Sequence, residues 1–577
     1  MSRQLGLSAT ASQREIAWLF LSALLCSIAI STVVFAQLES VPVANPVYDF
    51  LKRMEVKRVI TRYPDAVLPL SRRDVAEFLK TIDKHRSDIT ATERNVLDDF
   101  KVEFAHELGL GTENRFVVFS GEGGLSETIS GLTSDKEKFL YAWQDSSNTF
   151  FTDLLLSADF RGTSGDSRAK SGASVVGLGP RFRGTLRNRI GYELQVTNEQ
   201  IIGNREVALL DSTIRHNREL IDVPTARSLN FIESYLKVDA DVLTLQIGRE
   251  RLLWGYGVSD KLIVSDNAPD FDFGKIDAQV GSFRYMFFHG WLQGPTQTVI
   301  GRYSGVPEAL VGSKYLAGHR FELSFPRLFD FGLSELIVYS RRSLELAYLN
   351  PVNLFKEIEP ELHDRDNSFI STDFQLHTFS NLELYGTLLI DDIVLSKLGS
   401  RFYANEFAFT VGGNYIEPAG LENADLVLEY TRIDPYVYSH HIPENSFTHD
   451  QFIIGNHLGP NSDDVFTRAS YRFSRKWKAS LEMELSRHGD NIMDVRGNLV
   501  RNVGGSALYG HRAFDADDVS FLDGILTKTY SFRITSVYEI FNEFFLDLKY
   551  EFRRQRNVSI GRTFDDHSLF IQLRFDV

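Results

Sequence analysis

The sequence of 577 residues has a single cysteine, Cys26, which lies in an apolar N-terminal run from Ile16 to Ala36. We interpret this run as an export signal, because basic residues precede it and it ends Val34-Phe35-Ala36, with suitable residues at the −3 and −1 positions. Residues 1–36 are therefore expected to be removed. The mature chain would then have no thiol, which excludes disulfides, cysteine-ligated zinc and a cysteine nucleophile. An uncleaved inner-membrane anchor is the alternative, since the run is long enough to span a bilayer.

After this run, the sequence has no segment of about eighteen uninterrupted apolar residues, the length that a membrane-spanning helix requires. Hydrophobic residues make up 43% of the chain and the mean hydropathy is −0.16. These values exclude a disordered polymer and a polytopic helical membrane protein. They do not exclude a membrane β-barrel, because alternating apolar and polar residues average to the hydropathy of a soluble protein.

Recognised catalytic motifs are also absent. There is no serine-hydrolase elbow, and Gly177-Leu178-Gly179 is not a dinucleotide fingerprint because Phe182 stands where the third glycine is needed. His106-Glu107 does not begin a zinc-binding helix motif, because Leu110 replaces the second histidine. We therefore expect no cofactor and no enzymatic activity.

Two acidic stretches, Asp266–Asp277 and Glu357–Asp366, match no EF-hand spacing, and solvated loop carboxylates are preferred there over calcium ligands. His440-His441 is interpreted as a pair of exposed loop histidines rather than as transition-metal ligands. We therefore expect no metal. The excess of 77 acidic over 62 basic residues, a net charge of −15, offers no general attraction to a polyanion. Nucleic acid is not an expected partner, and an acidic ligand would have to be bound by a local basic cluster.

Residues 37–112 show helical spacing. Apolar residues recur at i, i+3, i+4 and i+7 from Val47 to Met54 and from Val75 to Ile82, and Ser71 can cap the second helix. A third helix is expected from about Thr92 to Glu107. Because a helical bundle of this size would be only marginally stable on its own, we expect it to pack against the rest of the protein.

From about residue 113 to residue 577 the period is two. In Arg320–Phe325 and in Leu546–Arg553, apolar and polar residues alternate strictly, and 44 Phe, 22 Tyr and 5 Trp enrich the apolar face. Long alternating segments with aromatic ends favour a transmembrane antiparallel β-barrel of about 18 strands over a tandem of soluble β domains. Short links such as Ser474-Arg475 are expected to be periplasmic turns. Long polar segments are expected to be extracellular loops: residues 202–228, 350–371, 434–464 and 489–523.

Four arginines, Arg181, Arg183, Arg187 and Arg189, alternate along one face of a predicted strand. Guanidinium groups facing lipid would be costly, so we expect all four to line the barrel lumen. Two roles remain open. The preferred one is pairing with lumen carboxylates that braces the wall, and the other is bidentate binding of an acidic glycan.

Several segments together resemble the Wzi family of outer-membrane capsule assembly proteins. The resemblance covers most of the mature chain, although no motif in it is as specific as a set of metal ligands. The residues that carry it are Val41-Pro42 to Tyr48, Pro69–Arg72, Gly248–Gly257, Ser265–Pro269, His319-Arg320, Glu335, Tyr348–Pro351, Asp366-Asn367, and Tyr385-Gly386 to Asp391-Asp392.

The resemblance implies an outer-membrane barrel of a Gram-negative cell with its helical bundle at the periplasmic end. It also implies a non-enzymatic, lectin-like protein that binds surface polysaccharide and helps to anchor or organise it as capsule. The expected partners are this polysaccharide and outer-membrane lipid, and the chain is expected to be a monomer. Trp254 could stack on a sugar, or Trp254-Gly255 could form a strand-end turn. The candidate ligand-binding residues are Arg181, Arg183, Arg187, Arg189, Trp254, Asp266, Asn267, Arg320, Asp366 and Asn367.

Two other functions stay open. A solute or carbohydrate channel would use the arginines as its selectivity lining. An outer-membrane hydrolase would use pairs of loop carboxylates as acid and base or nucleophile.

Overall fold

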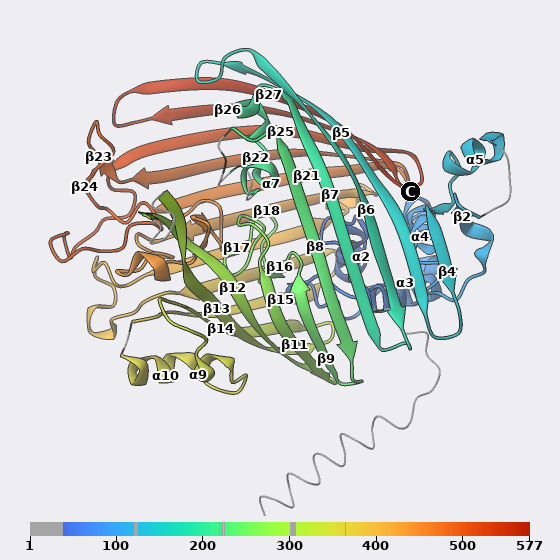
Figure 1. The fold of residues 1–577 in the computed structure, drawn as a ribbon, viewed down its shortest axis with the longest axis horizontal. Helices are drawn as coiled ribbons and strands as arrows, with labels where there is room; N and C mark the ends of the chain where they lie inside the picture. Colours follow the sequence, from blue (N-terminus) through green and yellow to red (C-terminus); the bar gives the residue numbers. More distant parts are fainter. Residues whose placement is uncertain are drawn as a thin grey trace, which may run out of the picture.

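The computed structural model describes residues 38–120, 125–217, 220, 223, 225–300, 307–363 and 365–577. The expected export signal, residues 1–36, lies outside these described residues. The described chain forms a small helical bundle followed by one large β-barrel (Figure 1). Among the described residues, no helix combines the length and the apolarity needed to cross a bilayer.

Eighteen long strands in the described chain form a closed antiparallel barrel, which confirms the predicted fold class. Strands that follow one another in this series pair with one another, and β27 pairs with β5 to close the wall. The barrel strands are β5 (Thr149–Gly165), β6 (Ser171–Leu186), β7 (Ile190–Gly203), β8 (Ser228–Asp239), β9 (Leu243–Arg249), β11 (Asp272–Val280), β12 (Phe283–Ile300), β13 (Pro307–Phe325), β14 (Phe329–Ser340), β15 (Asn367–Phe379), β16 (Leu382–Ile390), β17 (Phe407–Ile416), β18 (Ala424–Ile433), β21 (Ser462–Ser474), β22 (Trp477–Asp490), β25 (Ile525–Phe541), β26 (Phe544–Asn557) and β27 (Arg562–Asp576).

The other described elements are shorter. The helices are α2 (Val47–Val56), α3 (Arg72–Lys84), α4 (Ala91–Glu103), α5 (Leu125–Leu132), α6 (Arg205–Ala208), α7 (Ser212–Arg215), α9 (Leu346–Leu349) and α10 (Phe355–Ile358). The short strands are β1 (Val67–Leu68), β2 (Arg115–Val117), β3 (Glu137–Phe139), β4 (Tyr141–Gln144), β10 (Leu253–Trp254), β19 (Thr448–His449), β20 (Phe452–Ile453), β23 (Ile492–Met493) and β24 (Leu499–Arg501).

The strands place apolar side chains outside the barrel and polar side chains inside it. On β13, Leu323 and Phe325 are 41% and 44% exposed, whereas Glu322 and Ser324, which alternate with them, are buried. This is the reverse of a water-soluble protein, and it is the pattern that a lipid-facing wall around a polar lumen requires. The alternation read from the sequence is therefore an inside–outside alternation.

The two ends of the barrel differ. Short turns join β6 to β7, β11 to β12 and β21 to β22. The last runs through Arg475-Lys476, one residue beyond the expected link Ser474-Arg475. The long connections between β14 and β15, β18 and β21, and β22 and β25 lie at the opposite end. We call these the short-turn end and the loop end. In Figure 1 the helical bundle in blue lies at the short-turn end, and β23 and β24 lie at the loop end.

The helical bundle forms where the spacing predicted it. The Ser71 hydroxyl accepts a hydrogen bond from the Asp74 N–H at the start of α3, and Thr90 forms a capping box with Glu93 at the start of α4. The apolar stripes of α2, α3 and α4 share one core. The bundle also packs against the barrel, as expected, and the Asn381 N–H in the β15–β16 turn donates to the Val56 carbonyl at 3.3 Å.

The lumen beside β11–β18 is filled. The segment 250–271, between β9 and β11, folds into the barrel, where its strand β10 pairs with β1 of the N-terminal region. Its apolar side chains share a core with the inward-facing side chains of the wall and with the loop 434–461. A core of this kind excludes water from this side of the barrel.

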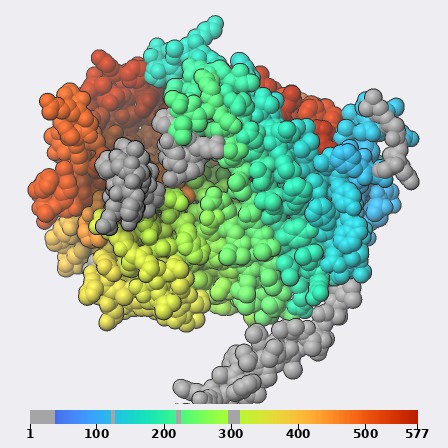
Figure 2. Space-filling view, viewed as in Figure 1, coloured from blue at the N-terminus to red at the C-terminus, as the bar shows by residue number. Residues whose placement is uncertain are grey.

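A second loop lies on the outer face of the barrel. The connection 341–366, which contains α9 and α10, packs Tyr348 and Phe355 against Ile337 and Tyr339 of β14. We call this segment the outer hairpin. Figure 2 shows it in yellow, beside the green strands of the wall.

Candidate functional site

Arg181 and Arg183 of β6 face the lumen and share one partner, Asp153 of β5. The Asp153 carboxylate lies 2.7 Å from an Arg181 terminal nitrogen and 3.1 Å from Arg183 Nε. The Asp153 and Arg183 side chains are buried. Because the pairs join neighbouring strands, they brace the wall, in agreement with the role that was preferred from the sequence.

Arg187 and Arg189 do not continue this stripe, and the prediction of four lumen arginines is wrong for these two. Strand β6 ends at Leu186, and residues 187–189 form the turn to β7. Arg187 and Asn188 have φ values of 51° and 55°, the left-handed conformation that Asn tolerates in tight turns. Arg187 is exposed at the short-turn end, and an Arg189 terminal nitrogen lies 3.6 Å from Asp241 in the next turn.

Arg320 of β13 is completely buried in the lumen. Its two terminal nitrogens donate to the two Asp373 carboxylate oxygens at 2.6 and 2.8 Å, and its Nε donates to Glu322 at 3.3 Å. The guanidinium is therefore paired within the wall and has no face open to a ligand. The prediction that Arg320 contacts a glycan is corrected to a structural ion pair.

Trp254 is also inaccessible. Its side chain has no exposed surface and packs edge-on against Phe288 of β12, with ring centroids 4.9 Å apart. The sugar-stacking interpretation is therefore wrong, whereas Trp254 does end a strand, β10, although this strand lies inside the barrel. Gly255 follows with φ 95°, a conformation that favours glycine and redirects the chain within the lumen.

Asp366 and Asn367 lie at the loop end and are buried. The Asp366 carboxylate accepts hydrogen bonds from both terminal nitrogens of Arg342, at 2.8 and 2.6 Å, and from the Tyr348 hydroxyl at 2.8 Å. Asn367 Nδ2 donates to the Ser439 carbonyl at 3.4 Å. Both side chains hold loops in place, and neither presents a free edge to solvent.

Asp266 and Asn267 belong to the segment inside the barrel. Asn267 Nδ2 donates to the Ile453 carbonyl at 3.0 Å, so it ties this segment to the loop 434–461. The Asp266 side chain is exposed. The ten sequence candidates therefore form no common site: they are spread over the short-turn end, the lumen and the loop end.

Residues that carry the family resemblance fix the outer hairpin. His319 Nε2 lies 2.9 Å from the Glu335 carboxylate on the outer face of the wall, where the pair would otherwise face lipid. The same carboxylate accepts the N–H groups of Phe355 and Lys356 at the start of α10. The hairpin thus covers the His319–Glu335 pair and supplies hydrogen bonds to the carboxylate. Without this cover the pair would be exposed to lipid, at a high cost in free energy.

A cavity of about 660 Å³ lies between the helical bundle and the wall at the short-turn end. Basic and acidic side chains face each other across it, among them Lys478 and Asp49, whose Nζ and carboxylate oxygen are 2.7 Å apart. The same pairing joins Arg475 to Asp99 of α4. Because its charges are largely matched, the cavity has no strong field for a polyanion.

The loop end carries a group of aromatic side chains that no spacing rule singles out. The rings of Tyr403 and His511 stack at 3.5 Å with an angle of 7° between their planes, and Tyr509 and Phe514 are 37% and 78% exposed. Phe402 is bridged to Asp518 through the backbone. We call Phe402, Tyr403, Tyr509, His511 and Phe514 the loop-end aromatic surface. Exposed rings of this kind offer flat apolar faces beside polar groups.

Charged side chains flank this surface. Arg512 donates to the Asp515 carboxylate with nitrogen–oxygen distances of 2.7 and 3.0 Å, and its guanidinium lies 4.5 Å from the centre of the Phe514 ring. The hydrogen bond to Asp515 raises the pKa of Arg512 above its already high value, and burial raises the pKa of Tyr403. Both groups therefore keep their protons at neutral pH and can donate to hydroxyl or carboxylate oxygens.

Sequence reasoning missed the loop-end aromatic surface. Its residues come from two loops, 391–406 and 491–524, that only the folded barrel brings together. The available signal was the Tyr509–Phe514 stretch, which places two aromatic residues inside a loop predicted to be long and polar.

The comparisons with known proteins agree with this architecture. Residues 164–566 match the family model described as capsule assembly protein Wzi. Among solved structures, the chain is similar to Wzi of Escherichia coli, an outer membrane protein involved in group 1 capsule assembly that is described as a carbohydrate-binding β-barrel. The identity is 13% and the TM-score 0.54, over 92% of this chain and 98% of that one.

The chain also matches OccK8 (OprE) and OprD of Pseudomonas aeruginosa, each with 10% identity and a TM-score of 0.41, over 74% of this chain and 98% and 95% of theirs. The curated proteins include no match to this sequence. The family model covers well over half of the chain, and the first of these structures shares its fold. The chain therefore belongs to the Wzi family of capsule assembly proteins.

Proposed function

We propose that the protein is a non-enzymatic, lectin-like protein of the outer membrane that binds surface polysaccharide and helps to hold it at the cell surface. The observation that carries this proposal is family membership combined with a barrel whose long loops gather at one end. The loop end would face the outside of the cell and the helical bundle would face the periplasm. Export would require the N-terminal signal, with cleavage after Ala36.

The binding face is the loop-end aromatic surface. Sugar rings carry apolar C–H faces that pack on aromatic side chains, while their hydroxyl groups need hydrogen-bonding partners nearby. Phe514 and Tyr509 provide exposed rings, and Arg512 provides a donor beside them. The buried candidates Trp254 and Arg320 have no role in this proposal.

A binding experiment tests it directly. Full-length protein in detergent is titrated with capsular polysaccharide from the producing strain and screened on a glycan array. The double variant Y509A/F514A is expected to bind at least tenfold more weakly, because each lost stacking contact is worth about 1 kcal/mol. The control is Phe119→Ala, which removes an aromatic ring outside these two loops; Phe119 is 65% exposed, between Tyr509 at 37% and Phe514 at 78%. Equal affinities of the double variant and wild type would reject this face.

A cell experiment tests the anchoring role. A strain without the gene should synthesise a normal amount of polysaccharide and release more of it into the medium. Wild-type protein should restore the cell-bound coat, and Y509A/F514A should not. A normal cell-bound coat in the deletion strain would contradict the anchoring role.

A further inference from the structure

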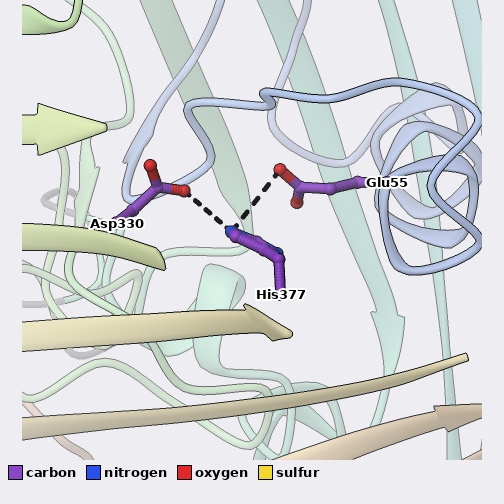
Figure 3. Close-up of side chains that lie close together, drawn as sticks. All are labelled: Glu55, Asp330 and His377. Carbon is purple, nitrogen blue, oxygen red and sulfur yellow. Dashed lines mark hydrogen bonds and ion pairs between the residues drawn. The ribbon is translucent and has the colours of Figure 1, made fainter. Parts of the chain in front are cut away.

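Three potential metal ligands meet where the helical bundle touches the barrel wall. Glu55 lies near the end of α2, Asp330 near the start of β14 and His377 near the end of β15. Figure 3 shows the two carboxylates on opposite sides of the His377 ring nitrogen. All three side chains are buried.

The distances suit a shared ion. His377 Nε2 lies 2.9 Å from an Asp330 oxygen and 3.9 Å from a Glu55 oxygen. One ligand atom from each residue falls within 4.8 Å of the other two. An imidazole nitrogen and carboxylate oxygens are ligands that zinc and its neighbours accept in proteins, at about 2.0–2.2 Å.

The second imidazole nitrogen gives an independent indication. The His377 residue is only 6% exposed, and its buried Nδ1 atom has no hydrogen-bond partner. A Glu383 oxygen lies 3.9 Å from it. A histidine that binds a metal through one nitrogen normally donates its other N–H to a carboxylate, and Glu383 occupies the position for that partner.

The charges around the site are unbalanced. Lys52 Nζ lies 2.9 Å from Glu55, 2.7 Å from Asp65 and 3.1 Å from Glu383. With Asp330, four carboxylates therefore lie near the ammonium groups of Lys52 and Lys261 and one imidazole. These four carboxylates still outnumber the ammonium groups, and a divalent cation would offset the excess of negative charge.

We propose that Glu55, Asp330 and His377 bind a divalent transition-metal ion of the zinc class. Glu55 belongs to the bundle, and the other two ligands belong to the wall. The ion is therefore a structural one that fastens the helical bundle to the inside of the barrel. This role does not depend on what the loop end binds.

The test uses full-length protein without a histidine tag, purified in detergent and treated with a chelator. Zinc and, separately, cobalt are added back, and bound metal is measured by mass spectrometry and by the cobalt absorption spectrum. We expect about one ion per chain and a rise of several degrees in the unfolding temperature with zinc, since a ligand of the folded state stabilises it. The variant His377→Gln should lose both effects.

The matched control is His319→Gln. His319 is also a buried histidine 2.9 Å from a carboxylate, that of Glu335, but it lies on the outer face of the wall. This variant should bind zinc as the wild type does. Folding of each variant is checked by heat-modifiable mobility on gels. Wild-type protein that binds neither zinc nor cobalt, or a folded H377Q variant that binds zinc with unchanged stoichiometry and affinity, would overturn the proposal.

Discussion

Several charged side chains of the barrel form ion pairs, and the burial of a pair determines how much it contributes to stability. The Arg320 and Asp373 side chains have no exposed surface, whereas the ion pair of Arg249 with Asp272 at 3.0 Å is about half exposed. Removing one partner of a buried pair leaves the other charge without compensation. The same chemistry in contact with water contributes little, because solvent screens both charges.

We therefore expect Arg320→Met to lower the free energy of unfolding by about 3–5 kcal/mol. Removing Asp373 as well, in R320M/D373L, should restore part of this loss, because Glu322 is then the one carboxylate of this group left without its partner. Arg249→Met is the surface control and should change stability by less than about 1 kcal/mol. Denaturant unfolding in detergent, followed by tryptophan fluorescence, measures all three. If R320M were as stable as R320M/D373L, the loss of Arg320 would not leave an uncompensated charge on Asp373.

A buried carboxyl pair at the loop end should make stability depend on pH. Burial raises the pKa of Asp391 and that of Glu406 well above their usual values, and nearby acidic groups raise both further. A raised pKa in the folded state means that the pair's contribution is complete below about pH 4.3 and is lost as the pH rises through the folded-state pKa. The unfolding temperature should therefore fall as the pH is raised across this range.

The variant Glu406→Gln has a neutral side chain at every pH, so its unfolding temperature should fall less steeply as the pH rises. Glu357→Gln, at an exposed position on the outer hairpin, should leave it unchanged. Thermal unfolding from pH 4 to pH 9 distinguishes the two. A pH profile of E406Q that overlies the wild-type profile would exclude this pair as its source.

At the scale of elements, the outer hairpin depends on polar contacts to the wall. Glu335 accepts the N–H groups of Phe355 and Lys356 and faces His319, so one carboxylate joins α10 to β13 and β14. The outward side of the hairpin is apolar: Leu346 and Val352 are 78% and 80% exposed. A loop that packs aromatic rings and hydrogen-bonded polar groups against the wall and exposes leucine and valine side chains is suited to lie at the edge of the lipid layer.

Glu335→Ala should loosen the outer hairpin, because it removes the acceptor for two backbone groups at the start of α10. We expect trypsin to cleave at Lys356 several times faster in this variant than in the wild type. Glu357→Ala, on the same hairpin but with an exposed side chain, should be cleaved at the wild-type rate. Cleavage mapped by mass spectrometry gives the answer, and equal rates for E335A and wild type would contradict the role assigned to Glu335.

At the scale of the molecule, the barrel is occupied from two directions. The bundle covers the short-turn end, and the segment 250–271 fills the lumen beside β11–β18 together with the loop 434–461. What remains near the bundle is a cavity of about 660 Å³ lined by paired charges. A cavity of this size can hold water and small solutes, and the packed lumen segments narrow the way through the barrel.

Planar-bilayer recording of the purified protein should therefore show no large, stable conductance. The control is an open general porin reconstituted under the same conditions. Steady large channels formed by the wild-type protein would favour the solute-channel alternative and would require the lumen segments to move.

Much of the architecture was predictable because one period repeats along the chain. The alternation in Arg320–Phe325 gives the inner and outer faces of β13 directly, and Ser71 marks the start of α3. The prediction that the arginine stripe faces the lumen failed after Arg183. Asn188, which has a positive φ, is the local sign of the turn that ends the strand. A one-strand pattern cannot show where a strand stops, because turn residues also fit a period of two.

The sites were less predictable because they join distant segments. Trp254 looked like a turn residue, and its burial depends on strand β1, far away in the sequence. Glu55, Asp330 and His377 lie on three elements, and no spacing connects them. Only the closed wall brings such residues together.

The pairing of β27 with β5 closes the barrel and therefore bears on when the wall can form during folding. Val577 and Leu154 exchange backbone hydrogen bonds at the end of this pair of strands, so the wall becomes a ring only when the final strand has arrived. The helical bundle is synthesised first and can be folded by then. The barrel wall can therefore close around a bundle that has already folded, without the bundle having to enter a closed barrel.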